Sequence, residues 1–528
     1  LAGRTSAIVE AAAAAADKHR FLHWPLAFPR VFTRDNPGFD AVVGNPPWEE
    51  VTVEALAFLG RYAPGLRSLA EEDRHRAIDT LVMDRPELLE QLAADQDRSR
   101  LERRYLGSGD YASMAGDPDL YKFFCQRYGL VLRSGGSLGV VLPRSALAAD
   151  GSAGFRRWLF EDNTCQRTDF LLNRGRWIFD THPQYTVALV SAQRAVPPPG
   201  HRVRVAGTAA SLQQWLDQAA SPGLAIPPQA FGPGWTVPLL RSQAEADLLA
   251  KLRRGSPFPC GAGGRWRCFP VAELHETNDR KLWQGAESGW PLWKGESFEQ
   301  YLPHGAGART CPASDAVMVK VRKPRPGSGS LLAGELSLAA RRKVVTDEVG
   351  RARVAFRDVS RATDSRTVRA CLIPPQTFLT NTAPYLTFAA GGDQARLACL
   401  GVMNSLPFDW QARRFVEIHL NFFVLEGLVV PDLSDDDFEA VADAAARLSY
   451  VDERFADVAE AVGIEPGALP DDERERLRVE IDARVARSWG LTADDLEVLL
   501  ADFTLDAVPT HYRRHLADRL QDVSAEAS

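Results

Sequence analysis

The spacing of apolar residues predicts alternating helices and strands in the first part of the chain. Between residues 119 and 132, apolar side chains recur at helical spacing, which predicts an amphipathic helix. Gly135-Gly136 then breaks the pattern, and the largely apolar run at 137–143 predicts a strand. Further strands are predicted at 168–173 and 185–193. This order is typical of a doubly wound α/β unit, whose ligands bind beyond the carboxyl ends of the strands.

Beyond this part the pattern changes twice. The run Pro197-Pro198-Pro199-Gly200 predicts a linker, and the residues after it are rich in Trp, Gly and Pro with short strand signals. From Asp432 onward, apolar positions return at helical spacing, for instance at Phe438, Val441 and Ala445. The tail is therefore predicted to be helical.

The length of 528 residues is too great for one hydrophobic core. We expect an α/β region at 1–195, an α+β region at 201–430 and an acidic helical region at 431–528. Within the first region, residues 50–104 read as a charged helical insertion.

Charge is distributed unevenly along the chain. The net charge is −7, but from Pro431 onward there are 25 Asp/Glu against 10 Arg, a net charge of −15. Between Met318 and Arg369 there are 13 Lys/Arg against 5 Asp/Glu, a net charge of +8. Such a basic segment suits the phosphates of DNA, although a solvated basic face without a partner fits the charge equally well.

Composition argues against a membrane or exported protein. No apolar run is long enough to span a bilayer, and the Ala-rich stretch at 1–16 lacks the layout of a signal peptide. The seven cysteines are scattered, and none forms a Cys-x-x-Cys pair. We therefore expect reduced thiols in a cytoplasmic protein and no metal site.

The clearest chemical signal is Asn45-Pro46-Pro47-Trp48, which follows the strand-like run at 39–43 and the break at Gly44. Two prolines cannot continue a sheet, and they hold the backbone rigid between a polar amide and a large aromatic ring. The Asn oxygen and a proline carbonyl can accept hydrogen bonds from an exocyclic amino group while the Trp stacks on its ring. The alternative is a strand-ending turn with an incidental Trp.

The residues around this motif resemble those of a known family. The block at 21–48 is similar to the fourth-motif region of DNA adenine-N6 methyltransferases of large restriction–modification and phage-defence enzymes (type IIG, BREX and DISARM-like). The segment 134–145 resembles the same enzymes, and the match continues in order and spacing to about Gln193. Looser similarities to the target-recognition region occur at 291–298, 356–361, 366–367, 381–382, 404–409 and 421–423.

The resemblance implies S-adenosylmethionine-dependent methylation of adenine N6 in double-stranded DNA. Asn45 and the Pro46 carbonyl are then expected to hold N6, with Trp48 stacked on the flipped base. The expected walls of the base pocket are Pro143, Arg144 and Ser145. The candidates for DNA contacts in the basic segment are Lys343, Arg357, Arg361 and Arg366.

The cofactor loop of this family is missing from its expected place. Only 44 residues precede Asn45, and they contain no strand followed by a glycine-rich loop and a helix. We therefore expect the second half of a Rossmann-like class I methyltransferase sheet, with the cofactor site on an upstream segment or a companion subunit. Such a half sheet leaves an unpaired edge and an uncovered apolar face.

Two alternatives remain open. A catalytically inactive DNA-recognition subunit that acts with a partner enzyme also fits the basic segment. Methylation of another amino group, such as cytosine N4 or an amide in protein or RNA, is the other alternative. Asn at the first motif position, in place of Ser or Asp, favours adenine.

Overall fold

The computed structural model describes residues 2–114, 116–180, 186–261, 264–322, 337–460 and 463–526. The chain forms two units. Unit 1 comprises Leu1–Ala225 with Gly234–Thr236, and unit 2 comprises Ile226–Pro233 with Val237–Ser528.

Unit 1 is built around one sheet with helices before and between its strands. Its helices and strands are, in chain order, α1 (Ala2–His19), α2 (Trp24–Ala27), α3 (Pro29–Phe32), β1 (Phe39–Gly44), α4 (Ala55–Gly60), α5 (Glu71–Asp84), α6 (Glu87–Leu106), α7 (Leu120–Val131), β2 (Leu132–Pro143), α8 (Ser145–Ala148), α9 (Ala153–Arg157), β3 (Thr164–Leu172), β4 (Thr186–Gln193), β5 (Val203–Ala209), α10 (Leu212–Ala219) and β6 (Leu224–Ile226).

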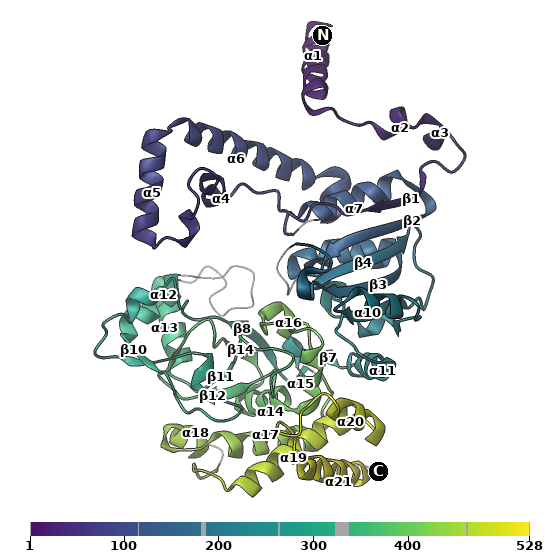
Figure 1. Cartoon of the computed structure of the whole chain (residues 1–528). Coiled ribbons are helices and arrows are strands. Elements are labelled where there is room, and N and C mark those ends of the chain that lie inside the picture. The colour runs from purple at the N-terminus through teal and green to yellow at the C-terminus, as the bar shows by residue number, and fades with distance from the viewer. Residues whose placement is uncertain are drawn as a thin grey trace. The chain divides into compact units, whose positions relative to one another are not determined.

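The sheet has the strand order β1-β2-β4-β3-β5-β6. Figure 1 shows β1, β2, β4 and β3 side by side in this order. β1 is parallel to β2 and β3 is parallel to β5, while β4 runs antiparallel to both β2 and β3. The carboxyl ends of β1, β2, β3 and β5 therefore lie along one edge of the sheet. The predicted α/β fold is confirmed, and the antiparallel direction of β4 is a feature that the sequence pattern did not indicate.

β1 is held against β2 by close backbone packing. Its register pairs Phe39 with Leu132 and Gly44 with Val140. Gly38 adopts a φ of +117°, and a Cβ there would stand 2.5 Å from the backbone nitrogen of Arg133. Only glycine therefore allows the chain to enter β1 so close to β2.

Gly135-Gly136 does not end a helix as expected. α7 ends at Val131, and β2 begins at Leu132 and runs through both glycines. Gly135 has a φ of +73°, its N–H donates to the Arg194 carbonyl and its own carbonyl accepts from the Gln193 side chain. These bonds let the glycines join the sheet as an irregularity in β2.

The Pro-rich segment at 196–200 lies between two strands of one sheet. β5 follows it and pairs in parallel with β3, with Val203 and Val205 buried. Burial of these valines attaches β5 to the first sheet, so the boundary between the units falls near Ala225 and not at the expected linker.

Unit 2 combines small sheets with many helices. Its elements are, in chain order, α11 (Gln243–Leu252), β7 (Ser256–Pro257), β8 (Arg267–Val271), β9 (Trp290–Trp293), β10 (Arg309–Cys311), α12 (Ala313–Arg322), α13 (Leu338–Val349), β11 (Arg353–Phe356), β12 (Ala370–Ile373), β13 (Phe378–Leu379), β14 (Tyr385–Ala390), α14 (Gly392–Asn404), α15 (Leu406–Arg413), α16 (Phe422–Glu426), β15 (Val429–Val430), α17 (Asp435–Ser449), α18 (Ala456–Glu460), α19 (Asp471–Ser488), α20 (Ala493–Leu500) and α21 (Thr510–Glu526).

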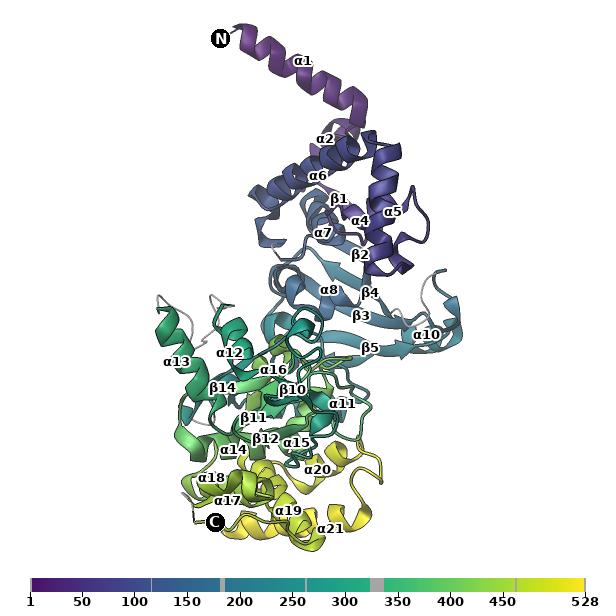
Figure 2. The same ribbon diagram turned by 90° about the vertical axis from the view of Figure 1, so that its left-hand side faces the viewer.

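The acidic tail is helical, as the apolar spacing predicted, and it belongs to the same unit as the preceding residues. α17 packs on α14 and on α19, and α19 packs on α21 (Figure 2). The strands form sheets of order β12-β11-β14-β8, β10-β9-β13 and β15-β7. Residues 237–430 and 431–528 therefore both belong to unit 2.

A buried network of charges ties the strands of unit 2 to α12 and α13. The fully buried Glu273 accepts hydrogen bonds from Lys320 and Arg353, each at 3.0 Å, and from the backbone of Leu379 at 2.8 Å. Lys320 also donates to Glu348 at 3.0 Å and bonds to the Tyr385 hydroxyl. Each charge in this network has an opposite partner, which is the condition for burying charges without a large loss of stability.

This network predicts a loss of stability in acid. Burial raises the pKa of Glu348, but the positive Lys320, the hydrogen bond from Thr387 and the positive Arg353 outweigh it and lower the pKa to about 2. The folded state is therefore stabilised by ionised Glu348 above the ordinary carboxyl pKa, and this contribution is lost as pH falls toward 2. We expect Glu348→Gln to lower the free energy of urea unfolding at pH 6, and the difference from the unsubstituted chain to shrink by pH 3. A difference that is the same at both pH values would contradict this expectation.

Candidate functional site

The structure brings together two of the segments that the sequence singled out. Asn45–Trp48 follows the end of β1, and Pro143–Ser145 lies at the end of the neighbouring parallel strand β2. The Trp48 indole N–H donates to the Val141 carbonyl at 3.3 Å, which attaches the first segment to β2 two residues before Pro143. Ligands in open α/β sheets bind at such carboxyl ends.

Asn45 presents its side-chain amide to solvent. The residue is exposed, and within the described parts of the chain its side chain has no hydrogen-bond partner. Pro46 beside it is buried, and Pro47 is half-buried. Gly44 lies against Tyr128, since a Cβ at Gly44 would stand 3.0 Å from the Tyr128 hydroxyl. The amide therefore projects from a backbone that is fixed by the prolines and by the contact with α7.

Trp48 is half-buried, and its ring is oriented by packing. The ring meets Phe179 edge to face at a centroid distance of 5.8 Å and an interplanar angle of 88°. It packs against a buried apolar cluster whose core is Leu171, Val187 and Ala209. Trp48 thus has a packing role in unit 1, and its stacking on a flipped base remains a prediction.

A third segment at the same edge was missed by the sequence reasoning. After β3, the buried Asn173 accepts from the backbone N–H groups of Ile178 and Phe179, both at 3.1 Å, and donates to the Phe179 carbonyl at 2.9 Å. Trp177 donates its indole N–H to the Leu172 carbonyl at 2.8 Å. A polar residue at a strand end, followed by aromatic residues, was the available signal for this loop.

The segment after β2 also has defined contacts. Pro143 is buried, and the Arg144 guanidinium lies 5.2 Å from the centroid of the Phe170 ring. The Arg144 backbone N–H donates to the Thr186 carbonyl at 3.1 Å, and the exposed Ser145 begins α8. The predicted pocket wall is thus a rigid continuation of β2.

The candidate DNA contacts fall into two kinds. Lys343 on α13 is exposed and pairs with Asp347 at 3.2 Å, and Arg361 is exposed. Arg357 donates to the carbonyls of Gly295 and Phe298, both at 2.7 Å. Its side chain is mostly buried, so Arg357 connects parts of unit 2 and offers little of its guanidinium to a DNA phosphate.

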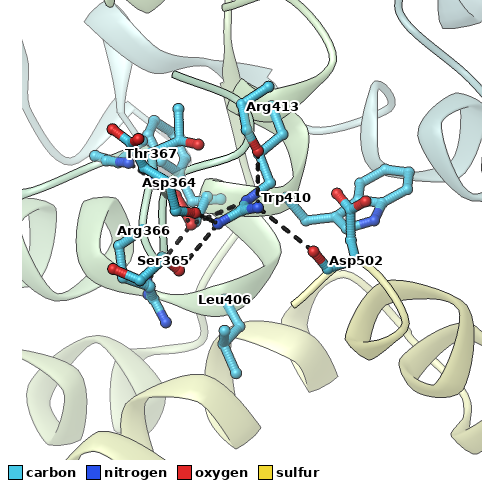
Figure 3. Close-up of polar contacts among 12 residues, drawn as sticks. Asp364, Ser365, Arg366, Thr367, Leu406, Trp410, Arg413 and Asp502 are labelled. Carbon is cyan, nitrogen blue, oxygen red and sulfur yellow. Dashed lines mark hydrogen bonds and ion pairs between the residues drawn. The ribbon is translucent and has the colours of Figure 1, made fainter. Parts of the chain in front are cut away.

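Arg366 is likewise held within unit 2. Its side chain bonds to the Asn404 carbonyl and lies 3.5 Å from Asp409. The adjoining loop is fixed by Arg413, which donates to the carbonyls of Ala362, Asp364 and Ser365 (Figure 3). Of the four candidates, Lys343 and Arg361 therefore remain the exposed ones. Part of the basic segment, residues 323–336, lies outside the described residues.

The described residues hold no evident metal site and no membrane-spanning helix. Groups of His, Cys, Asp and Glu that could hold a metal ion are absent from the ranges given above. No helix in those ranges is long and apolar enough to cross a bilayer. The seven cysteines are free thiols, with Cys260 exposed and the others buried.

Comparisons with known proteins give distant likenesses. No protein-family model and no curated protein matches the sequence. Among solved structures, the type IIL restriction-modification enzyme MmeI in complex with DNA is 12% identical with a TM-score of 0.42, over 90% of this chain and 57% of that enzyme. The type IIG restriction endonuclease BpuSI is 12% identical with a TM-score of 0.26, over 89% of this chain and 54% of that one.

A third solved structure is the ATP-dependent type ISP restriction-modification enzyme LlaBIII bound to DNA. It is 10% identical with a TM-score of 0.38, over 79% of this chain and 30% of that enzyme. This chain thus spans little more than half the length of MmeI and BpuSI. Sequence identities of 10–12% with these TM-scores do not assign an activity to this chain.

Proposed function

We propose that this chain carries the target-base pocket of a DNA adenine-N6 methyltransferase in a restriction–modification or phage-defence system. The observation that carries the proposal is the Asn45 amide, exposed and without a partner in the described residues, at the carboxyl end of β1. The sequence resemblance of 21–48 and 134–145 supports the same proposal.

In this proposal, the chain flips an adenine out of the duplex and holds its amino group. The Asn45 side-chain oxygen and the Pro46 carbonyl accept the two N6 hydrogens, and the ring of Trp48 stacks on the base. Those two bonds would draw the N6 hydrogens toward the acceptors and leave the nitrogen lone pair available for the new N–C bond. The S–C bond of the methyl donor would break as this bond forms, and one N6 hydrogen would then leave as a proton to water. Catalysis then rests on positioning and on complementary charge, so no general base is needed.

S-adenosylmethionine supplies the methyl group in this reaction class. Residues 2–38 form the helices α1, α2 and α3, so the described residues before β1 hold no strand followed by a glycine-rich turn. We therefore assign no residue of this chain to the cofactor, and we propose that an upstream segment or a companion subunit binds it.

The exposed side of β1 supports the proposal that another segment or subunit binds the cofactor. Among the described strands β1 bonds only to β2, and Val43 on it is 85% exposed. Strands of α/β sheets are normally covered on both faces, so an exposed strand valine marks a surface that another element covers. We propose that the cofactor-binding part pairs with β1 and covers Val43.

Substitution of Val43 tests this contact. Val43→Asp is expected to lower methyl transfer in cells at least about tenfold, because a charge is then buried in the proposed contact. The melting temperature of the isolated chain is expected to change little, because exposed positions contribute little to stability. Val196→Asp is the matched control, because Val196 is 76% exposed in the segment between β4 and β5. Equal losses of methylation in the two variants would contradict the proposed contact.

The direct test of the proposal is calorimetric titration of S-adenosylmethionine into the chain. The titration is done with and without a duplex in which one adenine lies opposite an abasic site. We expect binding of the duplex that weakens steeply with salt, and no binding of the cofactor by the chain alone. Binding of S-adenosylmethionine by the chain in the micromolar range, a binding free energy of about −8 kcal/mol, would mean that the chain itself holds the cofactor pocket. It would overturn the proposal that a separate part binds the cofactor.

A further inference from the structure

The C-terminal helices of unit 2 line a polar cavity that the proposed methylation does not use. Its volume is about 260 Å³. It lies against α19, the start of α21 and the loop before β12. The polar side chains on its walls include Gln300, Tyr301, Arg366, Asn404, Arg474, Arg478 and Tyr512.

Two arginines on α19 face this cavity without an acceptor. Arg474 and Arg478 are one helical turn apart, and within the described residues neither guanidinium has a hydrogen bond or an ion pair. The Nε of Arg478 is buried without a partner, and its guanidinium lies 5.9 Å from the centroid of the Tyr301 ring. Burial and the neighbouring positive charge of Arg478 lower the pKa of Arg474. The negative charges of Asp471 and of the buried Asp482 act on Arg474 and Arg478, respectively, without direct contact. Within the described residues, neither guanidinium therefore has the direct bond to a carboxylate that partly buried arginines normally have.

The carboxylates on the cavity walls are engaged elsewhere or exposed. Glu475 bonds to the two histidines of α21 at 2.9 and 3.1 Å. The buried Asp482 accepts from the Tyr512 hydroxyl at 2.6 Å and from the Leu406 backbone at 2.7 Å. Asp471 is exposed at the start of α19. None of the three forms an ion pair with Arg474 or Arg478.

Arg366 is a third arginine of the walls, and Asp409 at 3.5 Å balances its charge. Its loop is fixed by the bonds of Arg413, as Figure 3 shows, and its own side chain by Asn404 and Asp409. The Nε of Arg366 is buried without a hydrogen bond. The positive side of the cavity is therefore preformed on rigid elements.

We propose that this cavity binds a small phosphorylated compound through a phosphoryl group held by Arg474 and Arg478. One guanidinium group can donate two parallel hydrogen bonds to two phosphate oxygens. Two guanidinium groups match the double negative charge of a phosphoryl group better than the single charge of a carboxylate. The volume lies just below the range of about 300–1,000 Å³ for drug-sized ligands, which suits diphosphate or the phosphoryl end of a mononucleotide.

The charge around the cavity favours a small ligand over duplex DNA. From Pro431 onward the chain has a net charge of −15. A long polyanion is repelled by such a surface. A compact anion inside the cavity can bond directly to Arg474 and Arg478, because the wall carboxylates Glu475 and Asp482 are engaged by the histidines of α21 and by Tyr512. The site is independent of the proposed methylation, so either proposal can fail without the other.

The experiment is calorimetric titration of the full chain with diphosphate, with AMP and with a duplex that has no terminal phosphates. We expect one-to-one binding of diphosphate or AMP, and the tighter of the two identifies the ligand class. The double variant Arg474→Gln/Arg478→Gln is expected to weaken this binding at least about a hundredfold, because two charge-assisted pairs are lost. Arg476→Gln is the matched control, because it removes an exposed arginine from the same helix, and it is expected to change nothing.

Three results would overturn the proposal. The first is no binding of either small probe up to about 10 mM. The second is equal weakening by Arg476→Gln, which would mean diffuse attraction by the surface. The third is equal weakening of duplex binding by the double variant, which would make the cavity part of a DNA surface. The single variant Arg474→Gln replaces the double variant if the latter does not fold, with melting temperatures measured with and without diphosphate as a second readout.

Discussion

Asn45→Ala is expected to lower the rate of adenine methylation by about a hundredfold or more, because one positioned hydrogen-bonding group in a catalytic site has an effect of this size. The exposed amide is the acceptor that the proposal assigns to N6, and it has no partner in the described residues that would give it a structural role. The measurement is the rate at which an unmethylated plasmid gains N6-methyladenine in cells that carry the native locus.

Two further substitutions make this result specific. Asn45→Asp retains an oxygen acceptor and is expected to lose less activity than Asn45→Ala. Asn278→Ala removes an exposed amide from unit 2 and is expected to leave the rate unchanged. If Asn45→Ala methylates normally while deletion of the whole coding sequence abolishes methylation, the chain is a DNA-recognition subunit and its pocket is not catalytic.

Glu273→Ala is expected to destabilise unit 2 by about 3–5 kcal/mol, because removal of one partner leaves buried charges uncompensated. Glu273 is fully buried and holds Lys320, Arg353 and the backbone of Leu379 at once. Without it, the guanidinium of Arg353 loses its direct ion pair and keeps its bond to the Thr377 carbonyl and its place over the Tyr385 ring, while Lys320 keeps Glu348.

Hydrogen exchange followed by mass spectrometry measures this effect locally. Peptides that contain β11, β13 and β14 are expected to exchange faster in Glu273→Ala, because these strands lose their common anchor. Glu276→Ala is the control, since its ion pair with Arg309 spans 3.6 Å and is partly exposed, and such pairs contribute about 0–1 kcal/mol. Unchanged exchange in Glu273→Ala would mean that the network does not stabilise the sheet.

The segments that follow β1 and β2 could be predicted from the sequence because the signals that mark them are local. Pro46, Pro47 and Pro143 follow apolar runs directly, and prolines in such places favour the end of a strand. The helical tail followed from apolar spacing for the same reason. The adjacency of Asn45 and Pro143 then followed from the parallel pairing of β1 and β2.

Other features depend on tertiary contacts that a single sequence does not show. The insertion of β4 between β2 and β3 is decided by long-range pairing, and so is the position of β5 in the first sheet. The charge count of the basic segment did not reveal that Arg357 and Arg366 bond to carbonyls within unit 2. The wall formed by Asn173 and Phe179 was missed because its hydrogen bonds exist only once the β3–β4 loop is folded.

The proposed function uses three segments at one edge of unit 1. Because β1, β2 and β3 are parallel, the segments that follow them lie at the same edge of the sheet. Each segment is held by a hydrogen bond to or from the backbone. A rigid edge of this kind can position a flipped base without closure of a lid. The open side of β1 is where the proposed cofactor-binding part completes the site.

The chemical identity of the methylated base tests the central claim most directly. Nucleosides from the DNA of cells that carry the native locus are analysed by mass spectrometry and compared with those from cells in which the sequence of this chain is deleted. We predict N6-methyldeoxyadenosine in the first DNA and its loss in the second. The appearance of N4-methyldeoxycytidine in its place, or adenine methylation that persists after the deletion, would contradict the account.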